Sequence, residues 1–356
     1  MNILKQFAHF GFPFAALTAV TNLSAAPLPA NTTVAYQVID HAHDDRVVYS
    51  YAEHRVFRSA STVKLLIALD YLETKGPNAT IPPADLALLE PMLRWSDNAS
   101  ASTLWVRGGS DQIITRMRTK LSLVDTYAPA DPGMWGYTAV SAADLATAWE
   151  YILYRAAPSI RDTLLGYLYR PRQCASGCNQ FWGIPRACPY PRAAKQGWSG
   201  YDNGPKESCV EGSEVTPSDS ILKYDPPTGL STGGSGTLDL NNFVMHSTGT
   251  TDSGRIVFAV LTLAAKSRPY DSAAMIITGL TKSLYDNVIF NRQPASILKY
   301  PTGHNKNLTI MQSGPVLGYR LANEGAIFST IFDQLGRTFS AQPRDLRTNQ
   351  RTINAK

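Results

Sequence analysis

The chain has 356 residues, of which 44% are hydrophobic and 17% are charged, as in an ordinary globular protein with one large domain or two. Its net charge of +5 at pH 7 is mild, and the sequence contains no dense face of lysine and arginine with interleaved aromatic residues. These features exclude nucleic acid as an expected partner.

The first 26 residues are typical of a secretory signal peptide. Lys5 precedes an apolar run over residues 7–20, and small residues follow at positions 24–26. The alternative is a membrane anchor, but the apolar run is too short to span a bilayer. We therefore expect residues 1–26 to be a signal peptide, and the mature chain to be secreted or periplasmic without a membrane span.

Two β-rich runs, residues 33–40 and 46–51, predict a hairpin. The segment between them contains His41 and His43 beside two aspartates, which are residue types that bind metals. Nothing else nearby completes a ligand set. We therefore interpret this segment as a polar hairpin tip and expect no metal site.

The next run predicts the helix around which the chain is organised. Residues 65–72 are apolar on nearly every face, which indicates a helix buried on all sides. Ser61 lies in its first turn and Lys64 three residues later, so both side chains share one face. A buried lysine with a lowered pKa can take the proton of a serine hydroxyl and so create a nucleophile. The Ser-x-x-Lys motifs at Ser220 and Ser296 run into Tyr and then Pro, so neither begins a helix.

In the rest of the chain, the predicted helices come first and the predicted strands follow, so helices and strands do not alternate as βαβ units. Further helices are predicted, in chain order, over residues 84–95, 99–107, 113–121, 142–154 and 160–168. Strands are predicted over residues 193–199, 242–247 and 256–264, before a closing helix over residues 272–284. Because sheet strands come from both ends of the chain with a helical block between them, we predict an α+β fold with an antiparallel sheet.

Residues 27–288 are expected to form this domain. Residues 202–236 are rich in Gly, Pro, Ser and Thr, and predict a surface insertion. Residues 289–356 then form a C-terminal extension. Its last part, residues 341–356, is polar and mildly basic, and we expect it to be flexible.

Four cysteines cluster in one short segment: Cys174, Cys178, Cys188 and Cys209. In an exported protein an even number of cysteines predicts disulfides. Three pairings are possible, and proximity alone favours Cys174–Cys178 with Cys188–Cys209. A zinc site is the competing interpretation, but the spacing lacks the paired Cys-x-x-Cys pattern of such sites.

Three short motifs follow one another along the chain: Ser61-Thr62-Val63-Lys64, Ser96-Asp97-Asn98 and Lys195-Gln196-Gly197. Their order and residue types resemble the Ser-x-x-Lys, Ser-Asp-Asn and Lys-Thr-Gly motifs of class A β-lactamases and penicillin-binding serine hydrolases. The resemblance extends to Met92 before the second motif and to the two glycines at positions 108 and 109 after it. It covers roughly residues 33–287 and implies the fold of that family.

The resemblance also implies a role for each motif residue. Ser61 attacks an amide or ester carbonyl, Lys64 accepts its proton, and Ser96 passes a proton toward the leaving nitrogen. The implied substrate-binding residues are Asn98, Lys195, Gln196 and Gly197. Lys195 attracts a substrate carboxylate, and Gly197 lets the substrate approach the strand edge. The backbone N–H groups of Ser61 and Trp198 form the implied oxyanion hole.

Three features depart from the family pattern. Class A β-lactamases carry a glutamate that activates the deacylating water, but residues 122–140 contain no glutamate, and their only acids are Asp125 and Asp131. The segment from Ser61 to Ser96, 35 positions, is shorter than in class A enzymes. Gln196 replaces a Thr or Ser, and a Trp follows Gly197 where a small residue is usual.

These observations predict an exported serine hydrolase that forms an acyl-enzyme on Ser61, needs no cofactor and acts on an amide or ester of the β-lactam or D-Ala peptide class. Its partner is then a small-molecule or peptide substrate, with cell-wall peptide as one candidate. The missing glutamate argues against an efficient β-lactamase. The alternative is a binding or scaffold protein that has lost catalysis on the same fold. Gln196 and the shortened segment favour that alternative, whereas the intact Ser61, Lys64 and Lys195 oppose it.

Overall fold

The computed structural model describes residues 25–43, 46–189, 191–201, 209–211, 221–228 and 237–290, together with five strands between residues 308 and 355. The predicted signal peptide lies almost entirely outside the described residues, as does most of the predicted insertion at residues 202–236. Both stay predictions.

A five-stranded antiparallel sheet in the order β2-β1-β9-β8-β7 forms the centre of the domain. Its strands are β1 (Thr32–Asp40), β2 (Val47–Tyr51), β7 (Arg192–Ser199), β8 (Phe243–Thr251) and β9 (Ile256–Ala264). The first two come from the N-terminal end of the domain and the other three from its C-terminal end. This arrangement confirms the predicted α+β fold. The strand β8 is longer than predicted, because it continues beyond residue 247 to Thr251.

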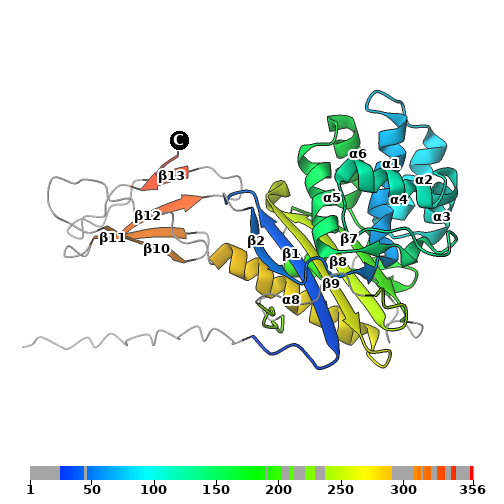
Figure 1. Ribbon diagram of the computed structural model, residues 1–356. Coiled ribbons are helices and arrows are strands. Elements are labelled where there is room, and N and C mark those ends of the chain that lie inside the picture. Colours follow the sequence, from blue (N-terminus) through cyan, green and yellow to red (C-terminus); the bar gives the residue numbers. More distant parts are fainter. Residues whose placement is uncertain are drawn as a thin grey trace, which may run out of the picture.

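Helices cover both faces of this sheet (Figure 1). One face carries the helical block, whose members are α1 (Lys64–Lys75), α2 (Pro83–Arg94), α3 (Asn98–Arg107), α4 (Asp111–Leu121), α5 (Ala142–Tyr154) and α6 (Pro158–Leu168). The other face carries α8 (Tyr270–Phe290), and the short α7 (Ile184–Ala187) packs against α8. Alternate side chains of a strand point to opposite faces. Two hydrophobic clusters result, one on each side of the sheet.

The central helix α1 is buried as predicted. Its residues from Lys64 to Asp70 are all buried, including two charged side chains. Asp70 accepts hydrogen bonds from Nε and Nη2 of Arg116 on α4 at 2.8 and 2.7 Å, which satisfies its charge. Lys64 has no carboxylate partner among the described residues. Its buried amine is instead satisfied by hydrogen bonds within the candidate active site.

Smaller elements frame the start of α1. A single 3₁₀ turn, η1 (Ala60–Val63), precedes the helix, and the two-residue strand β3 (Phe57–Arg58) precedes that turn. The strand β3 pairs with β4 (Ala139–Val140), which follows the 3₁₀ turn η2 (Trp135–Tyr137). This pairing holds the turn η2 beside η1 at the beginning of α1. A third 3₁₀ turn, η3 (Asp252–Gly254), joins β8 to β9.

The C-terminal strands form a second antiparallel sheet in sequential order. They are β10 (Leu308–Ser313), β11 (Val316–Leu321), β12 (Ile327–Phe332), β13 (Thr338–Ala341) and β14 (Ile353–Ala355). The strand β14 lies within the part that was expected to be flexible, and it pairs with β13.

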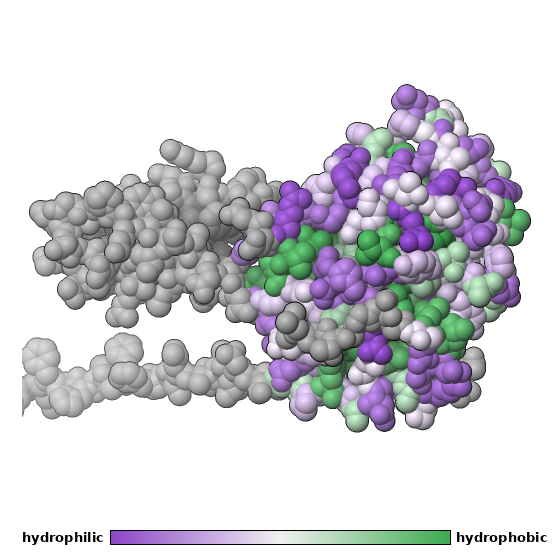
Figure 2. Space-filling view, in the orientation of Figure 1, coloured by the Kyte–Doolittle hydropathy of each residue, from purple (hydrophilic) through white to green (hydrophobic). Residues whose placement is uncertain are grey.

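On the face of the molecule shown in Figure 2, hydrophobic residues form patches among hydrophilic ones. None of the described helices has both the length and the apolar character needed to cross a membrane.

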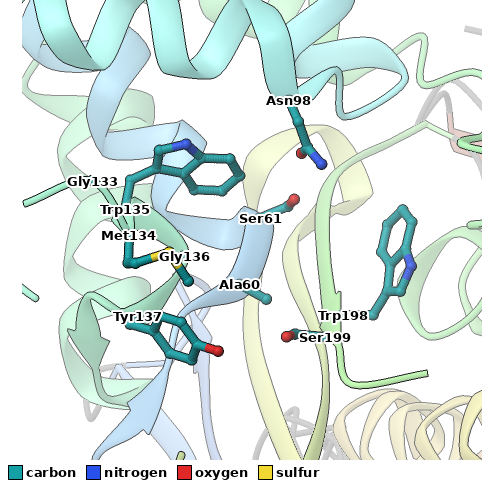
Figure 3. A pocket seen from close by; sticks show the side chains of 10 residues that line it. All are labelled: Ala60, Ser61, Asn98, Gly133, Met134, Trp135, Gly136, Tyr137, Trp198 and Ser199. Carbon is teal, nitrogen blue, oxygen red and sulfur yellow. The ribbon is translucent and has the colours of Figure 1, made fainter. Parts of the chain in front are cut away.

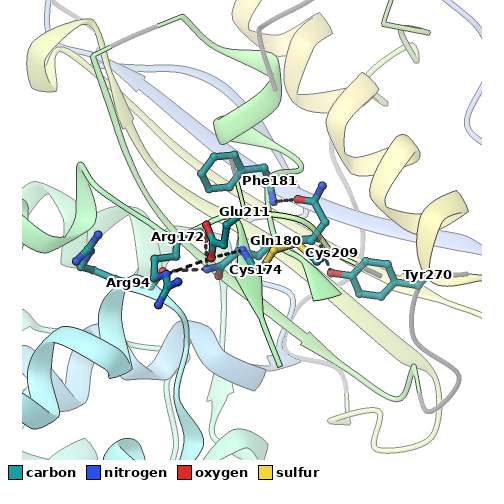
Figure 4. Close-up of a disulfide and its surroundings, with 9 residues drawn as sticks. Arg94, Arg172, Cys174, Gln180, Phe181, Cys209, Glu211 and Tyr270 are labelled. Atoms are coloured by element: carbon teal, nitrogen blue, oxygen red, sulfur yellow. Dashed lines mark hydrogen bonds and ion pairs between the residues drawn. A yellow bond between two sulfur atoms is a disulfide. The ribbon is translucent and has the colours of Figure 1, made fainter. Parts of the chain in front are cut away.

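The structure contains one disulfide, between Cys174 and Cys209 (Figure 4), whereas Cys178 and Cys188 are free thiols. The predicted pairs Cys174–Cys178 and Cys188–Cys209 are therefore wrong. Cys174 and Cys178 lie on the paired strands β5 (Cys174–Ala175) and β6 (Cys178–Asn179), where Cys178 pairs with Ala175. This register directs the two cysteine side chains to opposite faces of the ribbon. Cys188 is buried at the end of α7, in the cluster beneath α8.

Candidate active site

Ser61 lies on the turn η1, at the point where β3 passes into α1. Its side chain is largely buried but lines a cavity of about 290 Å³ (Figure 3). The preceding residue, Ala60, has a φ of 45°, in the left-handed region that residues other than glycine seldom adopt. Ser96 also has a positive φ, of 61°. Strained backbone of this kind persists where surrounding structure enforces it, and it is concentrated at functional sites.

Lys64 forms the centre of the hydrogen-bond network. Its Nζ lies 2.9 Å from Ser61 Oγ and 2.7 Å from Asn98 Oδ1, and it also contacts the backbone carbonyl of Ser96. The carbonyl and amide oxygens only accept hydrogen bonds, so they take the two N–H groups of a neutral amine. The amine lone pair is then free to accept the proton of Ser61.

The electrostatics of the site favour the neutral form of Lys64. Burial lowers its pKa to about 6, the nearby charge of Lys195 contributes to the same shift, and Asp97 opposes it. The Ser-x-x-Lys motif can activate Ser61 only if its lysine is uncharged at neutral pH. The burial of Lys64 explains why it is uncharged.

A second buried lysine approaches from β7. Lys195 Nζ donates to Ser96 Oγ at 2.9 Å, and Lys64 Nζ lies 3.3 Å from the same hydroxyl. Burial also lowers the pKa of Lys195, to about 7. Ser96 thus bridges the two amines. This arrangement provides a path for a proton between Lys64 and the position of a leaving group.

Asp97 holds the second motif, Ser96-Asp97-Asn98, in place at the beginning of α3. Its carboxylate accepts a hydrogen bond from the backbone N–H of Ser100 at 2.7 Å and so caps α3. Ser96 and Asn98 on either side of this cap both reach Lys64. The structure therefore brings together Ser61, Lys64, Ser96, Asn98 and Lys195, as the sequence predicted.

Gly197 has a structural role that the sequence did not indicate. A Cβ at this position would lie 2.9 Å from the carbonyl oxygen of Ser59 and from the backbone nitrogen of Thr62. Only glycine therefore allows β7 to pass this close to the turn that carries Ser61. Trp198, the next residue, lines the cavity beside Ser61, while its ring packs edge-on against Trp182 and Tyr270.

Gln196 points away from the cavity. Its amide nitrogen donates to the carbonyl of Trp182, on the side of the sheet that faces α8. Strand alternation explains this direction, because Lys195 and Gly197 occupy the opposite face. The Gln196 side chain therefore does not join the residues around Ser61, and its predicted contact with substrate has no support in this geometry.

One wall of the cavity consists of residues 133–137, which include Trp135 and Tyr137 (Figure 3). The centroid of the Trp135 ring lies 4.8 Å from Lys64 Nζ. Its indole nitrogen donates to Ser102 Oγ at 3.1 Å, which fixes the ring. From the sequence alone, this loop is notable for its lack of glutamate. The signal in the sequence for this wall is a tryptophan enclosed by two glycines, Gly133 and Gly136.

No carboxylate is found among the described residues that line this cavity. Asp125 is engaged with His54 Nδ1 at 2.8 Å, and Asp131 accepts the backbone N–H of Gly133 at 2.8 Å. Both acids of the stretch that lacks glutamate are therefore used to hold the loop.

Comparisons with known proteins give the fold. No protein-family model and no curated protein matches the chain. Among solved structures, the TLA-1 extended-spectrum β-lactamase is similar, with 14% identity and a TM-score of 0.50 over 73% of this chain and 94% of that chain. A class A β-lactamase from Mycobacterium abscessus has 15% identity and a TM-score of 0.49 over 72% and 94% of the two chains. PBP-A has 16% identity and a TM-score of 0.49 over 74% and 92%. The chain has the fold of the class A β-lactamases.

Proposed function

We propose that this protein is a serine hydrolase that forms an acyl-enzyme on Ser61 from an amide or ester, of the β-lactam or D-Ala peptide class. The observation that carries this proposal is the buried Lys64 amine, 2.9 Å from Ser61 Oγ, with a pKa lowered to about 6. A neutral amine at that distance is the base that a serine nucleophile requires.

The acylation step follows from the contacts. Ser61 Oγ bonds to the substrate carbonyl carbon while its proton moves to Lys64 Nζ. The backbone N–H groups of Ser61 and Trp198 stabilise the negative charge on the carbonyl oxygen. A proton then passes through Ser96 to the leaving nitrogen or oxygen, and the bond to the leaving group breaks. The positive charge of Lys195 favours a substrate that carries a carboxylate.

Hydrolysis of the acyl-enzyme is expected to be slow. Loss of one positioned general base typically reduces a rate about 10²–10⁴-fold. The described lining of the cavity contains no carboxylate to act as that base. We therefore propose an enzyme whose acylated form is long-lived, and not an efficient β-lactamase.

We also propose that the protein is exported. The signal-peptide pattern of residues 1–26 supports export. The disulfide between Cys174 and Cys209 is also consistent with an oxidising compartment.

The deciding experiment is intact-mass analysis after exposure to penicillin and to a fluorophosphonate. We expect one adduct on the wild type and none on Ser61→Ala. Ser296→Ala is the matched control, because Ser296 begins another Ser-x-x-Lys motif in the same chain, and it should label as the wild type does. Equal labelling of Ser61→Ala and the wild type would contradict the proposal.

A second candidate is a binding protein that has lost catalysis on this fold. The direction of the Gln196 side chain favours it, because the usual hydroxyl beside the lysine has no substitute there. Reversible binding of a penicillin to the wild type, with no covalent adduct at any pH from 6 to 9, would support this candidate against the first.

A further inference from the structure

A second cavity, of about 420 Å³, lies next to the first. It is lined by Val56, Tyr127, Tyr137, Leu238 and Leu240, with the short side chains of residues 128–130 and Ala139 between them. We call it the apolar groove. Its volume is within the range of sites that hold small molecules.

The groove and the candidate active site are neighbouring cavities that share one lining residue, Tyr137. This side chain lines both the groove and the cavity that contains Ser61. Tyr137 ends the turn η2, whose first residue is Trp135, the ring against Lys64. A molecule attached to Ser61 would therefore have to extend past Tyr137 to enter the groove.

A buried arginine holds the walls of the two cavities together. Arg58 donates from Nη2 to the carbonyl of Ser199, which lines the first cavity, at 3.3 Å. It donates from Nη1 to the carbonyl of Asp239, between the two leucines of the groove, at 3.1 Å. The Asp239 carboxylate in turn accepts the backbone N–H groups of Asn241 and Asn242, both at 2.8 Å. The leucines are thus fixed beside the active site.

The chemistry of the lining defines the occupant. Among the described residues, no acidic or basic side chain lines the groove. Leu240 is 53% exposed and Tyr127 47% exposed, so each leaves a large apolar surface in contact with water. Covering such a surface with an apolar group is favourable, whereas a charged group would lose its hydration without a partner.

We propose that the apolar groove holds an uncharged, apolar arm of the substrate that acylates Ser61, either an aliphatic chain or an apolar side chain. This inference rests on the proposed acylation of Ser61 and narrows the substrate class. The substrate then combines a reactive amide or ester with an apolar extension on the acyl side.

The test uses p-nitrophenyl esters whose acyl chains grow from two to eight carbons while the leaving group stays constant. The rate of Ser61 acylation is followed by release of p-nitrophenol and by intact mass. We expect the second-order rate constant to increase roughly two- to fourfold per methylene until the groove is filled. Leu240→Asn should flatten this increase, so that the ratio of the eight-carbon to the two-carbon rate constant falls toward one.

Leu222→Asn is the matched control, since Leu222 is 55% exposed and does not line the groove. It should keep the chain-length dependence of the wild type. If the wild type is acylated on Ser61 at a rate independent of chain length, the inference is overturned and the proposed function stands. If no ester or penicillin acylates Ser61, the proposed function and this inference fail together.

Discussion

At the level of single residues, the chemistry of the site depends on two buried lysines, Lys64 and Lys195, and on the hydroxyl of Ser96. Both amines contact Ser96 Oγ, and the pKa of Lys64 is lowered first by burial and then by the charge of Lys195. Charged amines this close destabilise each other, so one of them loses its proton more readily. In the proposed mechanism, the lysine nearer the nucleophile, Lys64, is the base.

This coupling predicts the pH dependence of acylation. A base must be unprotonated, so the wild-type acylation rate should increase with pH through about 6 and then level off. Lys195→Gln removes a neighbouring positive charge, and the midpoint should move to higher pH. The measurement is the rate of labelling by an uncharged fluorophosphonate, which does not need Lys195 for binding. An unchanged midpoint in this variant would show that the two lysines are not coupled.

Trp135 is expected to control the fate of the acyl-enzyme. Its ring covers Lys64 on the side of the cavity, and water has to reach the ester from that cavity. Trp135→Ala should therefore accelerate decay of the acyl adduct, measured by mass against time. The rate should still remain at least about 10²-fold below that of an enzyme with a positioned base.

Trp135→Phe keeps an aromatic ring over the lysine and serves as the control. It should retain the long-lived adduct. If the Ala variant and the Phe variant lose the adduct at the wild-type rate, the indole does not exclude water.

At the scale of elements, the site depends on how closely β7 approaches the turn η1. Gly197 is the contact point, because its Cα hydrogen faces backbone atoms of Ser59 and Thr62 that cannot move aside as a flexible side chain would. The strand carries Lys195 and the turn carries Ser61, so the separation of these elements sets the geometry of the candidate site.

Gly197→Ala should therefore disturb stability and chemistry together. Overpacking of this kind typically costs about 1–3 kcal/mol in the free energy of unfolding. Urea denaturation should detect that loss, and acylation of Ser61 should be slower in the remaining folded protein. Gly166→Ala on α6 is the control, because no atom lies within 4 Å of the added Cβ. It should be neutral, or more stable by up to about 1 kcal/mol. Equal stability of both variants would contradict the close approach.

For the whole molecule, the buried amines reduce stability. In the unfolded chain Lys64 and Lys195 each have the ordinary lysine pKa of 10.5, whereas burial in the folded protein lowers these pKa values to about 6 and about 7. Between pH 7 and 10 the unfolded chain therefore binds more protons than the folded one, so stability should increase with pH over this interval. Below the folded pKa values both states bind these protons, and the two lysines contribute no further slope.

The substitution Lys64→Met tests whether the buried amine lowers the free energy of unfolding. The variant should be more stable than the wild type at pH 7, by on the order of 1–4 kcal/mol, since an apolar side chain replaces a buried amine. The advantage should shrink toward pH 10. Urea denaturation at pH 7, 8.5 and 9.5 gives the comparison, with the exposed Lys75→Met as control. A Lys64→Met protein less stable than the wild type at pH 7 would contradict the proposed penalty.

The sequence by itself determined the elements and most of the candidate site. The apolar run after Lys64 predicted a helix buried on all sides, and each of the three motifs lies on the type of element that its local pattern predicted. These features are local, because hydrophobic periodicity and helix caps depend on residues only a few positions apart.

Only the tertiary structure decided what depends on direction and on distant contacts. The register of β5 and β6 sends Cys174 to Cys209 and not to Cys178, and the pleat of β7 turns Gln196 toward Trp182. The aromatic wall of the cavity and the apolar groove join segments that are remote in sequence. Their contacts follow from the packing of whole elements, because neither a spacing nor a residue type in the chain records which distant side chain will lie opposite.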